Sequence, residues 1–187
     1  TDADLTTSLK VLDEFESEPA GPWVRARGEV LVSSIVTVFK KIRFDTHENL
    51  GWGPVTLPEL EMQTTACWWT LPDELVESYG KEVLGAAMVG LAHLMRGIAP
   101  LYLMCASSDI SVEYHVRDPF TQKPTLYLYD CIQGGIGLSD RIYETGTLLF
   151  EQALSAVREC PCEQGCPSCV GAGAGEEAKK TLIDLLE

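Results

Sequence analysis

Basic residues are scarce in this sequence. Its 187 residues include 14 Lys and Arg against 28 Asp and Glu, which gives a formal net charge of -14 at pH 7. A surface this acidic repels DNA and anionic membranes, so any contact with nucleic acid has to come from a local basic patch. Glycine and proline, at 16 and 10 residues, are too few for a fibrous or low-complexity chain. With 45% hydrophobic residues, the sequence instead supports a globular fold with its own core.

The signatures of an independent enzyme are also missing. The sequence has no phosphate-binding loop of the Gly-x4-Gly-Lys-Ser/Thr type, no nucleophile elbow and no carboxylate pair spaced for acid–base catalysis. His47-Glu48 begins like a zinc-protease motif, but position 51 is Gly where that motif needs a second His. The glycines of residues 130–137 do not match the dinucleotide-binding fingerprint, and we interpret them as a tight strand-to-helix turn. We therefore expect the chain to be non-catalytic by itself.

The first residues differ in composition from the rest. The chain begins at Thr1 rather than Met and shows no basic and apolar leader, so we expect it to be a piece of a longer protein. Residues 1–22 are acidic and end in a cluster of Pro and Gly, which predicts a linker or return segment with a short helix near its start. Residues 23–187 are then predicted to form one domain.

Residue patterns along that domain predict several strands and helices. Runs of alternating apolar and polar residues, or of β-branched residues, predict strands at residues 28–44 (two strands or one bent strand), 61–71, 110–117 and 125–130. The last two strands are predicted to form a hairpin. Residues 45–60 contain several Gly and Pro and predict a loop. Helices are predicted to start at Pro72-Asp73 and to cover residues 82–104, 139–159 and 176–187. This order favours an α+β fold, with a mostly antiparallel sheet packed on helices.

The segment 82–104 is long and apolar enough to span a membrane. His93 and Arg96 lie in its middle, and we expect Pro100 to break it. We therefore interpret this segment as a helix buried in the domain, and we expect no membrane partner.

The seven cysteines are unevenly distributed. Cys67, Cys105 and Cys131 are scattered among apolar residues, and we interpret them as packing residues. The other four lie close together between the last two predicted helices: Cys160, Cys162, Cys166 and Cys169. Four thiolates with Gly and Pro between them predict one tetrahedral zinc ion, and a site closed by four cysteines is structural rather than catalytic. The alternatives are an iron–sulfur cluster, disulfides or an empty site. The pattern also predicts a reduced, cytosolic protein.

A local excess of basic residues lies between positions 25 and 43. It consists of Arg25, Arg27, Lys40, Lys41 and Arg43, and only Glu29 opposes it within that stretch. Such a patch could contact phosphates, and the alternative is a solvated strand end whose cations offset nearby acids. On a strand, Lys41 and Arg43 would share one face and Lys40 would lie on the other.

Three blocks of residues resemble one known family. They are Lys40-Lys41-Ile42-Arg43-Phe44-x-Thr46-His47-Glu48-Asn49-Leu50-Gly51-x-Gly53, Leu128-Tyr129-Asp130-x3-Gly134-Gly135-x-Gly137-Leu138, and Cys160-x-Cys162-x3-Cys166-Pro167-Ser168-Cys169. Together they are similar to the MrfA zinc-binding domain, over roughly residue 25 to the end of the chain.

The resemblance implies a function within a larger helicase. Such domains lie at the C-terminus of superfamily 2 DEAD/DEAH-type helicases, such as the bacterial MrfA-like DNA repair helicases and the Hrq relatives, which unwind 3′ to 5′ with ATP. It implies zinc on the four cysteines and packing on the motor domains of the same chain, where the domain helps to retain the translocated strand. DNA would be contacted through the full-length protein in the bacterial cytoplasm, with Lys40, Lys41, Arg43, His47 and Asn49 as candidate contacts.

The motor signatures of that family, Walker A and DEAH, do not occur in this sequence, so ATP hydrolysis is not expected of it. The alternative function is a protein-interaction module of another helicase-like protein, such as one in phage defence.

Overall fold

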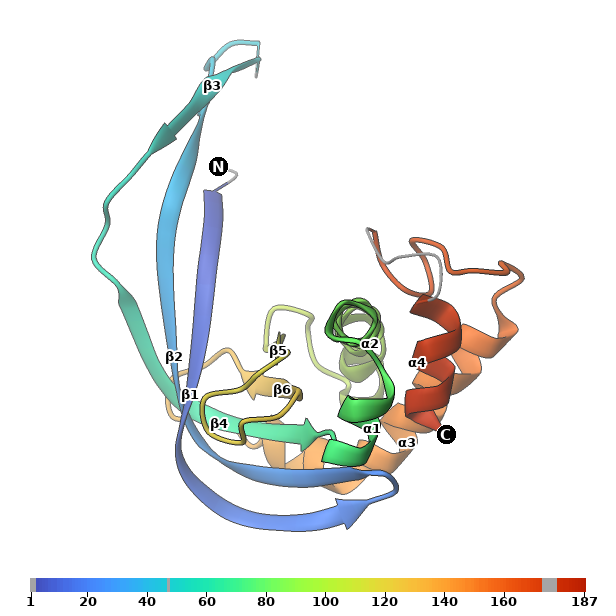
Figure 1. The fold of residues 1–187 in the computed structure, drawn as a ribbon. Coiled ribbons are helices and arrows are strands. Elements are labelled where there is room, and N and C mark those ends of the chain that lie inside the picture. The colour runs from blue at the N-terminus through green and yellow to red at the C-terminus, as the bar shows by residue number, and fades with distance from the viewer. Residues whose placement is uncertain (1–2, 47, 173–177) are drawn as a thin grey trace.

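An antiparallel sheet of six strands organises the protein. The computed structural model describes residues 3–46, 48–172 and 178–187, and Figure 1 shows their arrangement. The strands are hydrogen-bonded in the order β1-β2-β4-β6-β5, with β3 beside the far end of β2. Their bounds are β1 (Ala3–Ala20), β2 (Trp23–Ile42), β3 (Asn49–Pro54), β4 (Leu60–Thr70), β5 (Ile110–His115) and β6 (Thr125–Asp130). The predicted α+β class and the β5–β6 hairpin are confirmed.

Helices cover one face of this sheet and enclose the larger core. They are α1 (Asp73–Ser78), α2 (Lys81–Leu103), α3 (Leu138–Glu159) and α4 (Ala178–Leu186). The core between helices and sheet is built from Trp69, Leu91, Leu128 and Val157, among other buried apolar residues. Helix α2 is long and apolar enough to cross a membrane. However, 56% of its most apolar 18-residue stretch is buried inside this domain, as expected of a core helix.

The expectation that Pro100 breaks α2 is wrong. The helix continues to Leu103 and ends at Met104, which adopts a left-handed conformation. Pro100 lies in the last turn, where the missing N–H removes a single intrahelical bond. Its carbonyl also accepts the backbone N–H of Cys105 at 3.2 Å, so the proline helps to close the helix.

Residues 1–22 are predicted to be a linker or return segment with a short helix near its start, and the structure corrects the helix. Residues 3–20 form β1, which pairs with β2 from Ala3↔Phe39 to Ala20↔Trp23. Leu9 and Val11 are buried against aromatic residues on the sheet face opposite the helices, and this burial favours strand over helix. Gly21 and Pro22 form the tight connection of the β1–β2 hairpin. The domain boundary at residue 22 stays a prediction.

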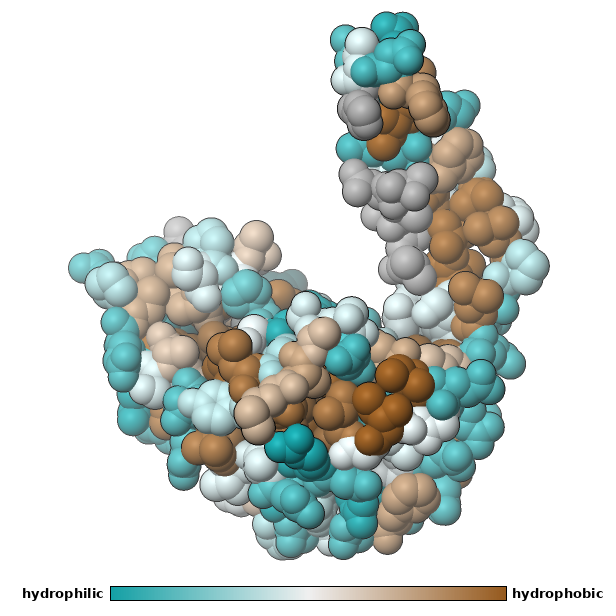
Figure 2. Space-filling model, turned by 180° about the vertical axis from the view of Figure 1, so that it is seen from behind, coloured by the Kyte–Doolittle hydropathy of each residue, from teal (hydrophilic) through white to brown (hydrophobic). Residues whose placement is uncertain are grey.

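The far half of β2 leaves the body of the domain. The pairing of β2 with β4 ends at Ser34, and beyond it β2 pairs only with β1 and β3 in the described residues. We call residues 35–46 and 48–54 the arm; it includes the end of β2 and β3. Figure 2 shows it as a column standing beside the body. The predicted loop over residues 45–60 is thus partly wrong, because β3 lies inside it.

The strand-to-helix turn at residues 130–137 is held by a buried carboxylate. Asp130 is 0% exposed and accepts backbone N–H groups from Ile136 (2.7 Å), Leu138 (3.2 Å) and Ser139 (2.9 Å). Helix α3 begins after Gly137 and has no side-chain cap there, so Asp130 satisfies its first N–H groups from the preceding strand. These are the groups that a phosphate would need, which supports the interpretation as a structural turn.

We predict that Asp130→Ala lowers the free energy of unfolding by about 3 kcal/mol, because buried N–H groups lose their acceptor. Urea unfolding followed by circular dichroism measures this. The control is Asp140→Ala. Asp140 lies in the first turn of α3, and its exposed carboxylate pairs with Arg27. We expect the control to cost less than about 1 kcal/mol, and an equal cost for both variants would contradict the role given to Asp130.

Candidate metal centre

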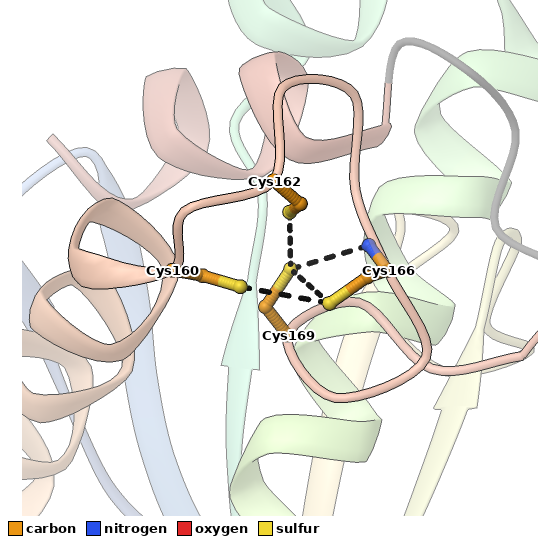
Figure 3. Close-up of side chains that lie close together, drawn as sticks. All are labelled: Cys160, Cys162, Cys166 and Cys169. Atoms are coloured by element: carbon orange, nitrogen blue, oxygen red, sulfur yellow. Dashed lines mark hydrogen bonds between the residues drawn. The ribbon is translucent and has the colours of Figure 1, made fainter.

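The four clustered cysteines meet in space (Figure 3). Their sulfur atoms all lie within 4.8 Å of one another. The Sγ atoms of Cys160 and Cys166 are 3.5 Å apart, and those of Cys162 and Cys169 are 3.4 Å apart. A tetrahedral zinc ion with Zn–S bonds of about 2.3 Å requires sulfur atoms about 3.8 Å apart, so the thiol arrangement fits one such ion. These distances are too long for disulfides, and all seven cysteines are free.

A helix end and a tight turn bring the cysteines together. Cys160 directly follows α3, and the turn at Cys166 is closed by backbone bonds from Cys169 (3.1 Å) and Val170 (3.0 Å) to its carbonyl. Gly165 has a φ of +124°, and a Cβ there would lie 2.8 Å from the Val170 side chain. Glycine is therefore required for the chain to reach Cys166. The cluster lies between α3 and α4, as predicted.

Lys179 in the first turn of α4 is bound to the same loop. Its side chain is buried, with the residue 8% exposed, and Nζ donates to the carbonyls of Cys160 (2.7 Å) and Cys162 (2.6 Å). A divalent ion held by four thiolates carries a net charge of about -2, so a buried ammonium beside it offsets part of that charge. Sequence reasoning missed this residue; the available signal was a lysine on the apolar side of a short helix.

The thiols differ in acidity. The backbone N–H of Cys169, with the Cys160 thiol, lowers the pKa of Cys166 to about 6. Burial raises the pKa of Cys169 to about 12. A metal ion must therefore displace protons to bind here, and its affinity rises with pH.

The three remaining cysteines lie apart from this cluster. Cys67 is fully buried, as expected for a packing residue, whereas Cys105 and Cys131 are only half-buried. Burial raises the pKa of each of the three thiols, which leaves them as protonated, weakly reactive groups.

The predicted basic patch is divided by the fold. Arg25 pairs with Glu18, and Arg27 pairs with Glu16 and Asp140. Both guanidinium groups also lie over the Tyr143 ring, at 4.7 and 5.7 Å from its centroid. These two arginines therefore hold the β1–β2 hairpin against α3 and do not join the basic residues of the arm.

The other basic candidates gather near the tip of the arm. Lys40 lies over the Trp52 ring at 5.6 Å, and Lys41 lies over the Phe39 ring at 5.7 Å. Arg43 pairs with Glu48 at 3.0 Å between two well-exposed side chains. The Asn49 side chain accepts the backbone N–H of Gly51 at 2.9 Å, and His47 lies outside the described residues. A role of these five residues in DNA binding stays a prediction.

The sequence of this chain is similar to one protein family and to several helicases. Residues 91–170 match the family model described as the MrfA Zn-binding domain. The ATP-dependent helicase YprA of Bacillus subtilis is 36% identical over 188 residues, which span 100% of this chain and 25% of that protein. The ATP-dependent helicase HRQ1 of Saccharomyces cerevisiae is 27% identical over 67% of this chain and 13% of its own length.

A solved structure of the helicase MrfA bound to DNA superposes with a TM-score of 0.80 at 36% identity, over 99% of this chain and 25% of that one. The chain thus spans about a quarter of the length of this helicase and of YprA. Together with the four-cysteine cluster, the family match supports a zinc site.

We predict that Lys179→Gln weakens metal binding about 10- to 100-fold while leaving all four thiolates in place, because a supporting charge is lost. Competition with a chromophoric chelator measures the affinity. The neighbouring variant Lys180→Gln, at an exposed position on the same helix, is the control and should bind as the unchanged chain does. Equal affinities for the two variants would show that Lys179 only packs.

Proposed function

The chain belongs to the MrfA Zn-binding domain family, and on that premise we propose that it is a zinc-folded accessory domain of an ATP-dependent 3′–5′ DNA repair helicase. The main support for the proposal is the structural similarity to a helicase bound to DNA, which extends over 99% of this chain. The rest of such a helicase supplies the motor domains and hydrolyses ATP. The domain packs on them and helps to retain the translocated strand.

The metal in this proposal is a single structural zinc ion. Cys160, Cys162, Cys166 and Cys169 complete its four positions, which leaves none for a substrate. The ion joins the end of α3 to the segment before α4, and α4 packs on α2 and α3. Because thiolate ligands must stay reduced, we also propose that the protein works in the bacterial cytoplasm.

The arm is the proposed contact with the nucleic-acid backbone. Lys40, Lys41 and Arg43 lie near its tip, away from the acidic body, and Trp52 beside them is about half exposed. Cations interleaved with exposed aromatic rings are typical of surfaces that follow a single strand. The overall charge of -14 opposes binding, so the interaction of this chain alone with DNA should be weak and sensitive to salt.

We predict that elemental analysis of the purified chain finds about one zinc per chain and no iron. Cys166→Ser should lose the metal and accelerate hydrogen exchange in α4, because the folding of this end depends on the metal. Cys105→Ser, outside the cluster, is the control and should keep its zinc. Iron with a visible absorption band, or a folded chain with less than about half an equivalent of zinc, would contradict the proposal.

A charge reversal in the full-length helicase tests the arm. We predict that Lys41→Glu with Arg43→Glu reduces unwinding and lowers the slope of log affinity against log salt by about one unit per lost phosphate contact. Lys10→Glu with Lys180→Glu changes the net charge equally at exposed positions away from the arm and should have little effect. Unchanged unwinding and an unchanged salt slope in the folded arm variant would show that the patch is a solvated surface.

A further inference from the structure

The connection between β5 and β6 displays an unusual set of side chains. Residues 116–124 form this connection, which Figure 1 draws in yellow close to α1. Arg117 is exposed, Phe120 is 52% exposed, and Lys123 is partly exposed. We call these three side chains and the loop that carries them the β5–β6 platform. They belong neither to the cysteine cluster nor to the arm.

A buried carboxylate fixes the shape of the platform. Asp118 is 1% exposed; its Oδ1 accepts the backbone N–H groups of Phe120 and Thr121, both at 2.9 Å. Its Oδ2 lies 2.7 Å from His115 Nδ1. Its backbone N–H donates to the carbonyl of Lys123 at 3.1 Å, and its own carbonyl accepts the N–H of Gln122 at 2.9 Å. The loop is therefore ordered before any ligand arrives, which lowers the entropic cost of binding.

The platform borders a cavity with basic side chains at its rim. A cavity of about 270 Å³ lies between the platform, α1 and the start of α2, and its apolar wall includes Val76, Leu84, Val116 and Pro124. The charged side chains that line it are Lys81, Arg117, Lys123 and Asp73.

Only part of this positive charge is neutralised by residues that the structure describes. Lys123 pairs with Asp73 at 2.8 Å, whereas Arg117 donates to the neutral Gln122 side chain at 3.3 Å. In the part of the chain that the structure describes, Lys81 forms no ion pair. The rim thus carries a net positive charge on a protein whose formal charge is -14, so it favours an anionic ligand.

A second hollow lies on the other side of the platform. It has a volume of about 410 Å³ and is lined by Ser8 and Leu9 of β1 together with Tyr114, His115 and Pro119. Arg117 borders both hollows. A chain of repeating anionic groups could therefore cross the platform from one hollow to the other, with Arg117 in the middle of its path.

We propose that the β5–β6 platform is a contact site for single-stranded nucleic acid, in which one base stacks on Phe120 while Arg117, Lys123 and Lys81 bind the adjacent phosphates. The inference rests on the proposed function and adds a second contact surface to it, on the body rather than on the arm. An exposed aromatic ring on the same loop as two cations, with an apolar hollow bordered by that loop, is the combination that single strands bind. A protein partner that used the same cations would need acidic side chains, and in that case the platform variants would bind oligothymidylate as the unchanged chain does.

The test measures binding of a fluorescein-labelled oligothymidylate to the zinc-loaded chain by anisotropy over a series of salt concentrations. Phe120→Ala should weaken binding about tenfold, because one stacked base contributes about 1–3 kcal/mol, with little change in salt slope. Phe120→Trp should preserve it. Arg117→Ala and Lys123→Ala should each lower the salt slope by about 0.7. Lys180→Ala is the matched control, since it removes one exposed charge elsewhere and should leave binding unchanged.

The outcomes separate this inference from the proposed function. If Lys41→Glu with Arg43→Glu weakens binding while the platform variants bind as the unchanged chain does, the inference is wrong and the proposed function stands. If the unchanged chain binds no oligothymidylate even at low salt, the inference falls together with the proposed DNA contact of the domain. Circular dichroism and zinc content confirm that each variant is folded, and Phe120 is exposed enough for its truncation to spare the core.

Discussion

The buried Asp130 carboxylate is the interaction that joins the two halves of this domain. It ends β6, the fully buried strand of the sheet, and it holds the first N–H groups of α3. The far end of α3 leads directly into Cys160. The position of the first metal ligand is therefore set by a rigid helix whose start is fixed by the sheet. A carboxylate that accepts several N–H groups is stable without water, which explains why it can lie in the core.

The same arrangement occurs in the connection that precedes β6. Asp118 is also buried and also accepts backbone N–H groups, and the pKa of its carboxyl is lowered overall: burial acts to raise it, but bonds from His115 and Thr121 outweigh this. Below the folded-state pKa the carboxyl gains a proton, so the stability that Asp118 contributes is complete above the ordinary Asp pKa and is lost on acidification. Two acids thus order two loops, one leading toward the metal and the other toward the platform.

The sequence predicted what local pattern and spacing determine. The cysteine cluster, the buried α2 and the amphipathic α3 follow from residues close together in the chain. Prediction from the sequence failed for β1 and β3. Their acidic or glycine-containing sequences become strands only because β2 pairs with them. Lys179 and Asp130 were missed for a related reason. Charged residues are exposed in most proteins, and their burial here depends on partners distant in sequence.

The length of β2 has a consequence for local stability. Up to Ser34 the strand lies between β1 and β4 inside the sheet, but beyond that residue it has lost β4 as a neighbour. The two halves of β2 can therefore unfold in separate local events. Opening of the arm breaks none of the hydrogen bonds between β2 and β4. The arm, together with the start of β1 that pairs with it, can therefore open while the metal centre and the pairing of β2 with β4 stay intact.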